Sequence, residues 1–486
     1  MVFNSFNFLI VFPLLFLLYY LIPERLPKWR NGFLLVVSYL LYMNWNPAYA
    51  LVLLGVTLIT FGGGCLLDAQ AAKSEKLRVD DNDNRKSRKQ LVWCFALLAL
   101  LPLLVYKYYN FINDTCYGIL STIGLRFKLP GLNWAIPMGI SFFTFQALGY
   151  LLDVYKRRIP AEHDFLTYAL FMSFFPSIVA GPINKASLVI PQLKAKRPYF
   201  DYSKAVEGLK MLLWGMFMKV VVADRVALYV DTVFPSYMNY TGMTCFVASI
   251  LYTIQIYADF AGYSLMAIGV GKTLGFELTE NFRRPYFAVS VTDFWRRWHI
   301  SLSTWLKDYV YIPMGGSRCS KPRNYWNIFV TFLVSGIWHG ASWTFIIWGI
   351  WHGVFQIIEK AIGQQKCEYG WLGKTLKILI TFLLVNFAWI FFRMPTLGDA
   401  TGMIARIFDV SLPKTIYVSG FTDLAFVMLG VVMLFLKDLR DEFFPNRYKM
   451  FDNRRTAVRW CSYLFVMAAI LLTGVFGADQ FIYANF

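Results

Sequence analysis

Long apolar runs recur along this chain from one end to the other. Three of them are LLVVSYLLYM (34–43), LVLLGVTLITF (51–61) and ILITFLLVNFAWIFF (378–392). About 20 mostly apolar residues suffice for a helix to cross the hydrocarbon core of a bilayer. Because such runs repeat along the whole length, they predict an all-α, polytopic membrane protein.

The composition supports this class. Apolar residues make up 57% of the 486 residues, charged residues only 16%, and the mean hydropathy is +0.48. Soluble domains are about half apolar and a quarter charged. The net charge of +18 is explained better by basic cytosolic loops than by nucleic acid. The seven cysteines lack paired spacing, so we predict neither a disulfide framework nor a metal site.

The charged loops set the predicted topology, with about twelve crossings and the N-terminus outside. The first apolar segment, 6–22, lacks the features of a cleaved signal peptide and is expected to stay as a membrane helix. The basic loops expected in the cytosol are 71–90, 283–323, 360–374 and 437–459.

The segment FLTYALFMSFFPSIVAGP (165–182) does not fit this topology as a full crossing. A crossing there would place the lysines that follow it outside. Pro176 and Pro182 interrupt the segment, and broken helices at membrane depth are tolerated where they line a cavity. We therefore predict that 165–182 is re-entrant.

Segment 258–326 is rich in aromatic residues without being a continuous span. Treated as one helix, residues 295–310 place three tryptophans on an apolar stripe, with Arg296 and Arg297 opposite. This pattern predicts an interfacial helix along the membrane, with His299 at the edge of the stripe. From spacing alone, His299 either orients that helix through a backbone hydrogen bond or contributes to a site.

His339 follows an apolar stretch, 327–337, that rises only about 16 Å as a helix. It is therefore expected near the bilayer midplane, where an ionisable residue is costly and marks a functional site. His352 repeats the Trp-His-Gly triplet but would face another way on a continuous helix, so we predict a structural or supporting role for it. His163 lies in a polar stretch and is expected to be solvated.

A neutral imidazole near pH 7 is suited to general base catalysis, for example on a hydroxyl that attacks an acyl carbonyl. The sequence contains no HxxEH-type or CxxC spacing, no GxSxG elbow and no P-loop. Acyl transfer assisted by one or two histidines is the simplest chemistry left. Composition alone does not choose between it and a proton-coupled transporter.

Several long stretches resemble the membrane-bound O-acyltransferase (MBOAT) family. They are YADFAGYSLMAIGVGKTLGFELTENFRRPY (257–286), SVTDFWRRWHISLSTWLKDYVYIPMGG (290–316) and SGIWHGASWTFIIWG (335–349). GISFFTFQALGYLLDVY (139–155) and FFPSIVAGPI (174–183) are similar to the bacterial branch, and AWIFFRMPTLGDA (388–400) to the members that acetylate alginate. The resemblance covers about residues 1–395.

This resemblance implies a ring of tilted helices around a funnel or tunnel, with re-entrant and interfacial helices. It implies that His339, in the Trp-His-Gly motif, is the catalytic histidine and that His299 is the second polar residue of the site. We expect one integral membrane domain over 1–486, with a family core to about 395 and additional transmembrane helices over about 396–486.

The function implied is O-acetylation of an extracytoplasmic polysaccharide in the bacterial inner membrane. The donor would be acetyl-CoA or an acyl carrier thioester, with no permanently bound cofactor, and the partner an external SGNH-type acetyltransferase. The residues expected to hold the donor's phosphates or a carrier protein are Arg283, Arg284, Arg296 and Arg297, although each also fits an ordinary cytosolic loop. The residues expected to support the site are Asp259, Tyr263, Asp293 and Trp338, and both aspartates could equally cap helices.

Three alternatives stay open at this point. D-alanyl transfer to teichoic acid uses similar histidine motifs. A proton-coupled exporter of a polymer or lipid intermediate shares the buried histidine and the broken helix. A structural subunit that docks an external enzyme would need neither histidine.

Overall fold

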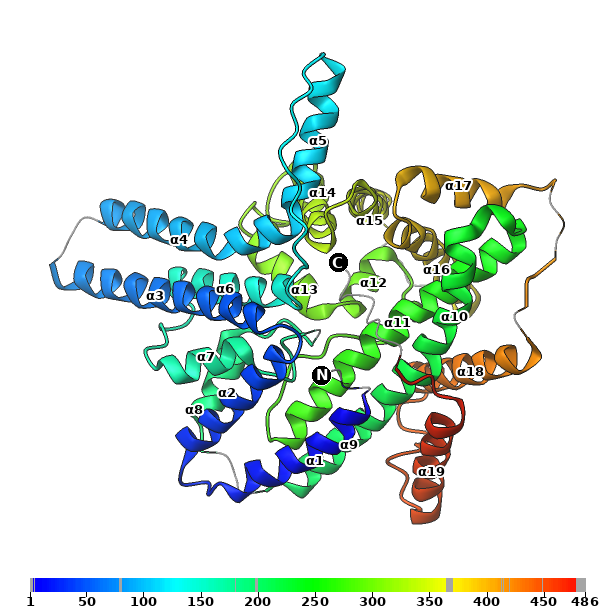
Figure 1. Ribbon diagram of the computed structural model, residues 1–486, viewed down its shortest axis with the longest axis horizontal. Helices are drawn as coiled ribbons and strands as arrows, with labels where there is room; N and C mark the ends of the chain where they lie inside the picture. Colours follow the sequence, from blue (N-terminus) through cyan, green and yellow to red (C-terminus); the bar gives the residue numbers. More distant parts are fainter. Residues whose placement is uncertain are drawn as a thin grey trace. The chain divides into compact units, whose positions relative to one another are not determined.

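The computed structural model describes residues 3, 5–77, 81–179, 181–196, 200–363, 370–411, 413, 415–418, 420–447 and 449–477. All regular secondary structure in these residues is helical, which confirms the predicted fold class (Figure 1). The chain divides into two compact units. Unit 1 comprises Phe6–Val206 and Val270–Thr279, and unit 2 comprises Val2–Ser5, Glu207–Gly269 and Glu280–Phe486.

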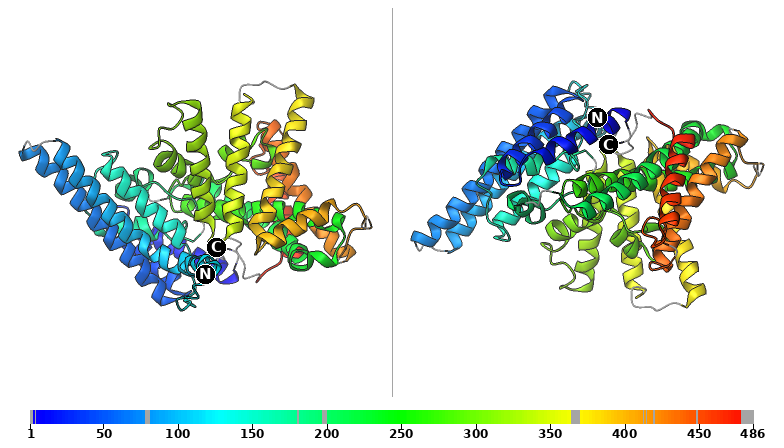
Figure 2. Two further views of the ribbon diagram at one scale, coloured as in Figure 1. Left: turned by 90° about the horizontal axis from the view of Figure 1, so that it is seen from above. Right: turned by 90° about the horizontal axis from the view of Figure 1, so that it is seen from below.

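Unit 1 is built around three helices that pack side by side, α3 (Pro47–Leu77), α4 (Asp81–Leu103) and α6 (Ile140–Tyr155). The long α3–α4 pair is drawn in blue in Figures 1 and 2. The other elements of unit 1 are α1 (Phe6–Leu21), α2 (Pro27–Met43), π-helix η1 (Leu104–Tyr108), α5 (Tyr109–Thr122), α7 (Phe165–Ser173) and α8 (Ala186–Lys194).

Helix α7 is short and ends where the sequence predicts a break. Asp164 caps its start by accepting a hydrogen bond from the Leu166 N–H. The helix ends at Ser173, three residues before Pro176. Its nine residues rise about 14 Å, roughly half a hydrocarbon core. The predicted break is confirmed, and the re-entrant topology stays a prediction.

Unit 2 holds most of α9 (Tyr202–Met216) and α11 (Gly242–Thr273). Its further elements are η2 (Phe217–Ala223), α10 (Asp224–Val233), η3 (Phe234–Asn239), η4 (Pro285–Phe287), α12 (Val291–Arg297), α13 (Ile300–Leu306), η5 (Lys307–Tyr311), α14 (Lys321–His339), α15 (Trp343–Ala361), α16 (Trp371–Arg393), α17 (Leu397–Phe408), α18 (Phe421–Phe443) and α19 (Thr456–Thr473). Its core is strongly aromatic: Trp298, Trp348 and Trp389 are fully buried.

Five of the described helical stretches are long and apolar enough to cross a membrane, so the chain is a multi-pass membrane protein. They are Pro47–Lys73, Arg85–Thr122, Gly242–Thr273, Trp371–Arg393 and Thr456–Thr473. The first apolar helix, Asn7–Leu21, is shorter. The total of about twelve crossings stays a prediction.

The prediction of a single interfacial helix over 295–310 is wrong. Helix α12 ends at Arg297, Trp298 is extended and His299 is left-handed, with φ 43° and ψ 54°. Helix α13 then begins at Ile300. The apolar stripe over 295–310 could not predict this break. The backbone groups that stabilise it belong to residues 281–283, outside the range over which the periodicity was assessed.

Candidate active site

His339 is the last residue of α14 and is 2% exposed. Helices α14 and α15 pack closely against each other, and glycines at the contact permit it. A Cβ added at Gly336 would lie 2.5 Å from the Phe345 carbonyl oxygen, and one at Gly349 would lie 2.5 Å from that of Phe332. The chain turns between His339 and Trp343, where α15 begins. The ring of His339 lies in the packed interior.

His299 is fully buried and lies in the turn between α12 and α13. Two backbone hydrogen bonds join this turn to residues 281–283: Arg283 N to Arg297 O at 2.8 Å and Ile300 N to Asn281 O at 2.9 Å. Left-handed backbone is unfavourable for a residue with a Cβ and tends to occur at functional sites. The bonds to segment 281–283 therefore hold His299 in a conformation that a continuous helix would not allow.

The structure brings the two predicted histidines together. Their ring centroids are 6.4 Å apart and their planes are inclined by 62°. Trp338 contacts both rings, at 5.9 Å from His299 and 4.8 Å from His339. The ring of Phe260 lies edge-on to His299 at 4.7 Å, and Trp348 packs against His339 at 4.8 Å. Trp338 thus packs against both histidine rings.

A polar network surrounds His299 on one side. Asn281 Oδ1 lies 3.2 Å from His299 Nδ1, 2.9 Å from Ser301 Oγ and 3.3 Å from Ser301 N. Asn281 Nδ2 donates to Ser264 Oγ at 2.9 Å. The four side chains are at most 4% exposed. Asn281 therefore links His299 to α11 through buried hydrogen bonds.

Two further residues expected to support the site, Asp259 and Tyr263, lie on α11. Asp259 forms a buried ion pair with Lys219 at 2.7 Å, and Lys219 also pairs with Asp224 at 2.7 Å. The ring of Tyr263 is buried and packs on Phe3 at 4.8 Å.

Asp293 lies in the first turn of α12. This position is compatible with the alternative that Asp293 caps a helix. Its N–H donates to Ser290 Oγ, and its carboxylate accepts from the Val289 N–H and from Arg297. These contacts order the start of the helix that leads to His299.

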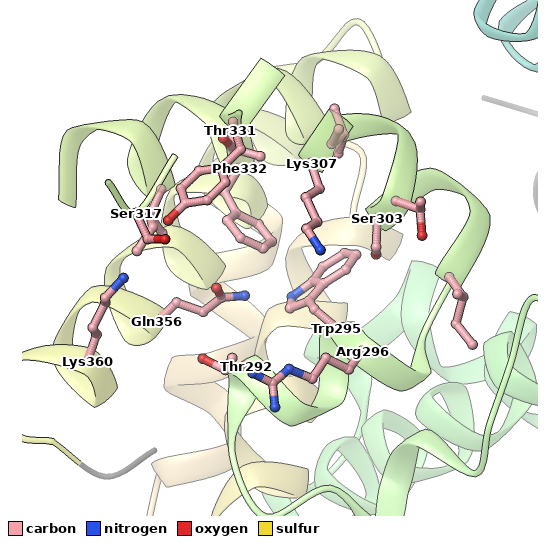
Figure 3. A pocket seen from close by; sticks show the side chains of 15 residues that line it. Thr292, Trp295, Arg296, Ser303, Lys307, Ser317, Thr331, Phe332, Gln356 and Lys360 are labelled. Atoms are coloured by element: carbon pink, nitrogen blue, oxygen red, sulfur yellow. The ribbon is translucent and has the colours of Figure 1, made fainter. Parts of the chain in front are cut away.

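A cavity of about 550 Å³ opens beside α12, between α13, α14 and α15 (Figure 3). Trp295, Lys307 and Gln356 point towards its centre from different elements. Its lining includes three cations, Arg296, Lys307 and Lys360, and no acidic residue among the lining side chains that the structure describes. Its charge suits an anionic ligand with an apolar portion.

Only one of the four predicted donor-binding arginines lines this cavity, namely Arg296. Arg283 pairs with Glu280, at 3.1 Å from its Nε. Arg284 and Arg297 both donate to Glu442, at 2.8 and 2.9 Å. The charge pattern could not reveal the role of Arg284 and Arg297, because Glu442 lies 158 and 145 positions away from them in sequence.

Sequence reasoning missed three residues that build the site: Asn281, Glu359 and Glu442. Glu359 on α15 accepts hydrogen bonds from Thr292 N at 3.0 Å and Thr292 Oγ1 at 2.9 Å, at the start of α12. A carboxylate at a helix N-terminus satisfies unpaired N–H groups and favours the helix dipole. Glu359 is the one acidic residue in the apolar stretch 343–361, and this isolation was the sequence signal that could have identified it.

His352 is fully buried and separated from His339 by Trp348, whose ring centroid is 4.9 Å from that of His352. Trp295 also packs on it, at 5.2 Å. Among the described residues, neither ring nitrogen has a hydrogen-bond partner. This position is compatible with the predicted supporting role. His163 is exposed, as predicted, and pairs with Asp68 at 3.1 Å.

The part of the chain that the structure describes contains no group of three or more His, Cys, Asp or Glu side chains that could hold a metal ion. The site that the structure assembles is a pair of imidazoles inside an aromatic cage. A polar network lies on one side of that pair, and a cation-lined cavity lies beside α12, the helix that leads to it.

Comparison with known proteins gives a consistent result. Residues 50–395 match the model of the membrane-bound O-acyltransferase family. The chain is 39% identical to the probable alginate O-acetylase AlgI of Pseudomonas aeruginosa, over 84% of this chain and 75% of that protein. It is 35% identical to the peptidoglycan O-acetyltransferase of Helicobacter pylori, over 82% and 78%. It is 27% identical to the teichoic acid D-alanyltransferase of Bacillus subtilis, over 63% and 79%.

Proposed function

The chain belongs to the membrane-bound O-acyltransferase family and is an O-acyltransferase, and from that premise we propose that it transfers an acetyl group from a cytosolic thioester towards a polysaccharide outside the membrane. The alginate and peptidoglycan relatives support acetyl as the acyl group and a polysaccharide as the acceptor. D-alanyl transfer is the second candidate, and the lower identity and coverage of the teichoic acid relative make it the weaker one.

The observation that carries the proposal is the pair of buried imidazoles of His299 and His339, 6.4 Å apart. Burial disfavours the charged form of an imidazole and so keeps one ring nitrogen available as a base. In the proposed step, His339 takes the proton of an acceptor hydroxyl as its oxygen bonds to the acyl carbonyl carbon. The carbon–sulfur bond breaks, and the leaving thiolate takes up a proton to become the free thiol.

The cation-lined cavity is the proposed entry for the donor. Arg296, Lys307 and Lys360 would bind phosphate groups of acetyl-CoA or acidic groups of an acyl carrier. Its apolar part, including Trp295 and Phe332, suits an uncharged pantetheine arm. The other three arginines, Arg283, Arg284 and Arg297, pair with carboxylates. We therefore assign them to stabilising the fold of segment 258–326 and not to binding the donor.

The proposal includes an extracytoplasmic SGNH-type partner that receives the acetyl group and a location in the bacterial inner membrane. The basic loops and a thioester made in the cytosol support this orientation. No resident cofactor is needed for the proposed chemistry, since the donor brings its own activated acyl group.

The test is acetyl transfer by membranes that contain the protein and receive radiolabelled acetyl thioester. We expect label in polymer with the wild type and a loss of about 100-fold or more with His339→Ala. His163→Ala, an exposed histidine in unit 1, is the matched control and should keep the wild-type rate. A wild-type rate for folded His339→Ala would refute the assignment of the base.

Two rival functions give different outcomes in the same assay. An exporter would move polymer without covalent label. A docking subunit would tolerate replacement of both His299 and His339 while its complex still assembled.

A further inference from the structure

Asn281 contacts the turn at His299 through both its side chain and its backbone. Its side-chain oxygen faces His299 Nδ1 and both donors of Ser301, and its backbone oxygen accepts from the Ile300 N–H. We propose that Asn281 is a positioning residue that holds His299 as the neutral tautomer with its hydrogen on Nδ1, so that Nε2 is the ring nitrogen that accepts a hydrogen bond from the bound substrate. This inference rests on the proposed function and deepens it.

The orientation of the Asn281 amide follows from its neighbours. The Ser301 N–H can only donate, and it lies 3.3 Å from the Asn281 atom assigned as oxygen. On the other side, the Asn281 NH2 group donates to Ser264 Oγ at 2.9 Å. A flipped amide would place its NH2 group against the Ser301 N–H, donor against donor. The oxygen therefore faces His299.

The tautomer of His299 follows from that oxygen. An amide oxygen only accepts, so the ring nitrogen 3.2 Å away must carry the hydrogen. A neutral imidazole with its hydrogen on Nδ1 has its lone pair on Nε2. Complete burial favours the neutral ring over the charged one. Asn281 thus decides which edge of His299 can accept a hydrogen bond.

The backbone supports the same role. His299 adopts φ 43°, which a residue with a Cβ rarely keeps without support. The Ile300 N–H bond to Asn281 O at 2.9 Å and the Arg283 N–H bond to Arg297 O at 2.8 Å supply that support. Asn281 therefore fixes both the direction in which the ring leaves the chain and the nitrogen that carries the hydrogen.

The neighbours of His299 make a pH readout interpretable. From α11, Phe260 faces the ring, and from α14, Trp338 and His339 do. Of these three, His339 is the titratable one. A carboxylate introduced at position 281 would add a negative charge within hydrogen-bond distance of His299 Nδ1, so its effect on the ring should dominate the pH profile.

The experiment compares acetyl transfer by Asn281→Leu, Asn281→Asp and the control His163→Ala across pH, with wild type and His339→Ala alongside. Asn281→Leu removes the acceptor and should lower kcat about 10- to 100-fold with little change in KM. Asn281→Asp keeps an acceptor but favours the imidazolium, so the acidic limb of its kcat profile should move up by about 1 to 3 pH units. His163→Ala changes an exposed side chain of unit 1 and should keep the wild-type profile.

The outcomes separate the two proposals. An inactive wild type would refute the proposed function itself. An active wild type with folded Asn281 variants of unchanged kcat and pH profile would overturn the role of Asn281. Loss of folding in both Asn281 variants, with His163→Ala folded, would also overturn it by assigning Asn281 a purely structural task.

Discussion

His299 and His339 lie with their ring centroids 6.4 Å apart, although they come from different elements of the fold. His299 is held by a left-handed turn before α13, and His339 by the end of α14. Trp338 contacts both rings. Because both rings pack against Trp338 and both belong to the proposed site, we expect them to act as a unit.

The first prediction concerns this unit. If both rings contact the bound substrate in the same step, their effects on kcat should not multiply. We expect His299→Ala to lower kcat about 10- to 100-fold, and the double variant with His339→Ala to be no slower than His339→Ala alone. Independent, multiplied losses in the double variant would contradict a shared substrate contact.

The second prediction concerns the cation-lined cavity. Arg296→Gln removes a charge that lines it and should raise KM for an anionic thioester donor about three- to tenfold, with kcat nearly unchanged. Arg323→Gln is the matched control, because Arg323 is exposed at the start of α14 and does not line the cavity. Equal KM values for the two variants would remove Arg296 from donor binding.

The third prediction concerns the buried carboxylate of Glu359. Glu359→Gln keeps the shape of the side chain but loses acceptor capacity at the start of α12. The expected loss of stability is about 1 to 3 kcal/mol, measured as a lower melting temperature in detergent. The exposed Glu24→Gln is the control and should melt like the wild type. An unchanged melting temperature for Glu359→Gln would argue against its capping role.

The fourth prediction concerns pH and Glu442. Burial alone would raise the pKa of Glu442, but hydrogen bonds from Arg284 and Arg297 outweigh it and hold the pKa below its usual value. A lowered pKa contributes stability above the unfolded pKa, and that contribution is lost as the pH falls through the folded pKa.

The corresponding measurement compares melting temperatures of wild type and Glu442→Gln over a range of pH. The variant should melt lower near neutral pH, and the difference should shrink on acidification as the wild-type carboxylate becomes protonated. A difference that stays constant down to about pH 3 would show that the charge of Glu442 is not what stabilises this cluster.

Features encoded in short stretches were predictable from the sequence. Apolar runs predicted the all-α membrane class, and Pro176 predicted the break after α7, which ends at Ser173. The Trp-His-Gly and Arg-Trp-His motifs identified the two histidines that the structure brings together. These signals are local, so neither distant partners nor tertiary packing were needed to find them.

Features that depend on distant partners were not predictable. A helical stripe over 295–310 cannot reveal that Asn281, 18 positions before His299, stabilises a left-handed turn there. Likewise, four arginines of similar appearance have different roles because Glu442 lies 158 positions after Arg284 and 145 after Arg297. Tertiary hydrogen bonds outweighed local periodicity in both cases.

The link from Glu442 to Arg284 and Arg297 also bears on how short a working version of this chain can be. Residues 50–395 carry the sequence pattern shared with relatives, including both histidines of the candidate site. A chain trimmed to that pattern would retain all the recognisable chemistry, but Arg284 and Arg297 would both lose the carboxylate of Glu442, and Arg297 would keep only Asp293. The smallest stable enzyme should therefore extend at least through α18, beyond the last residue of the family pattern.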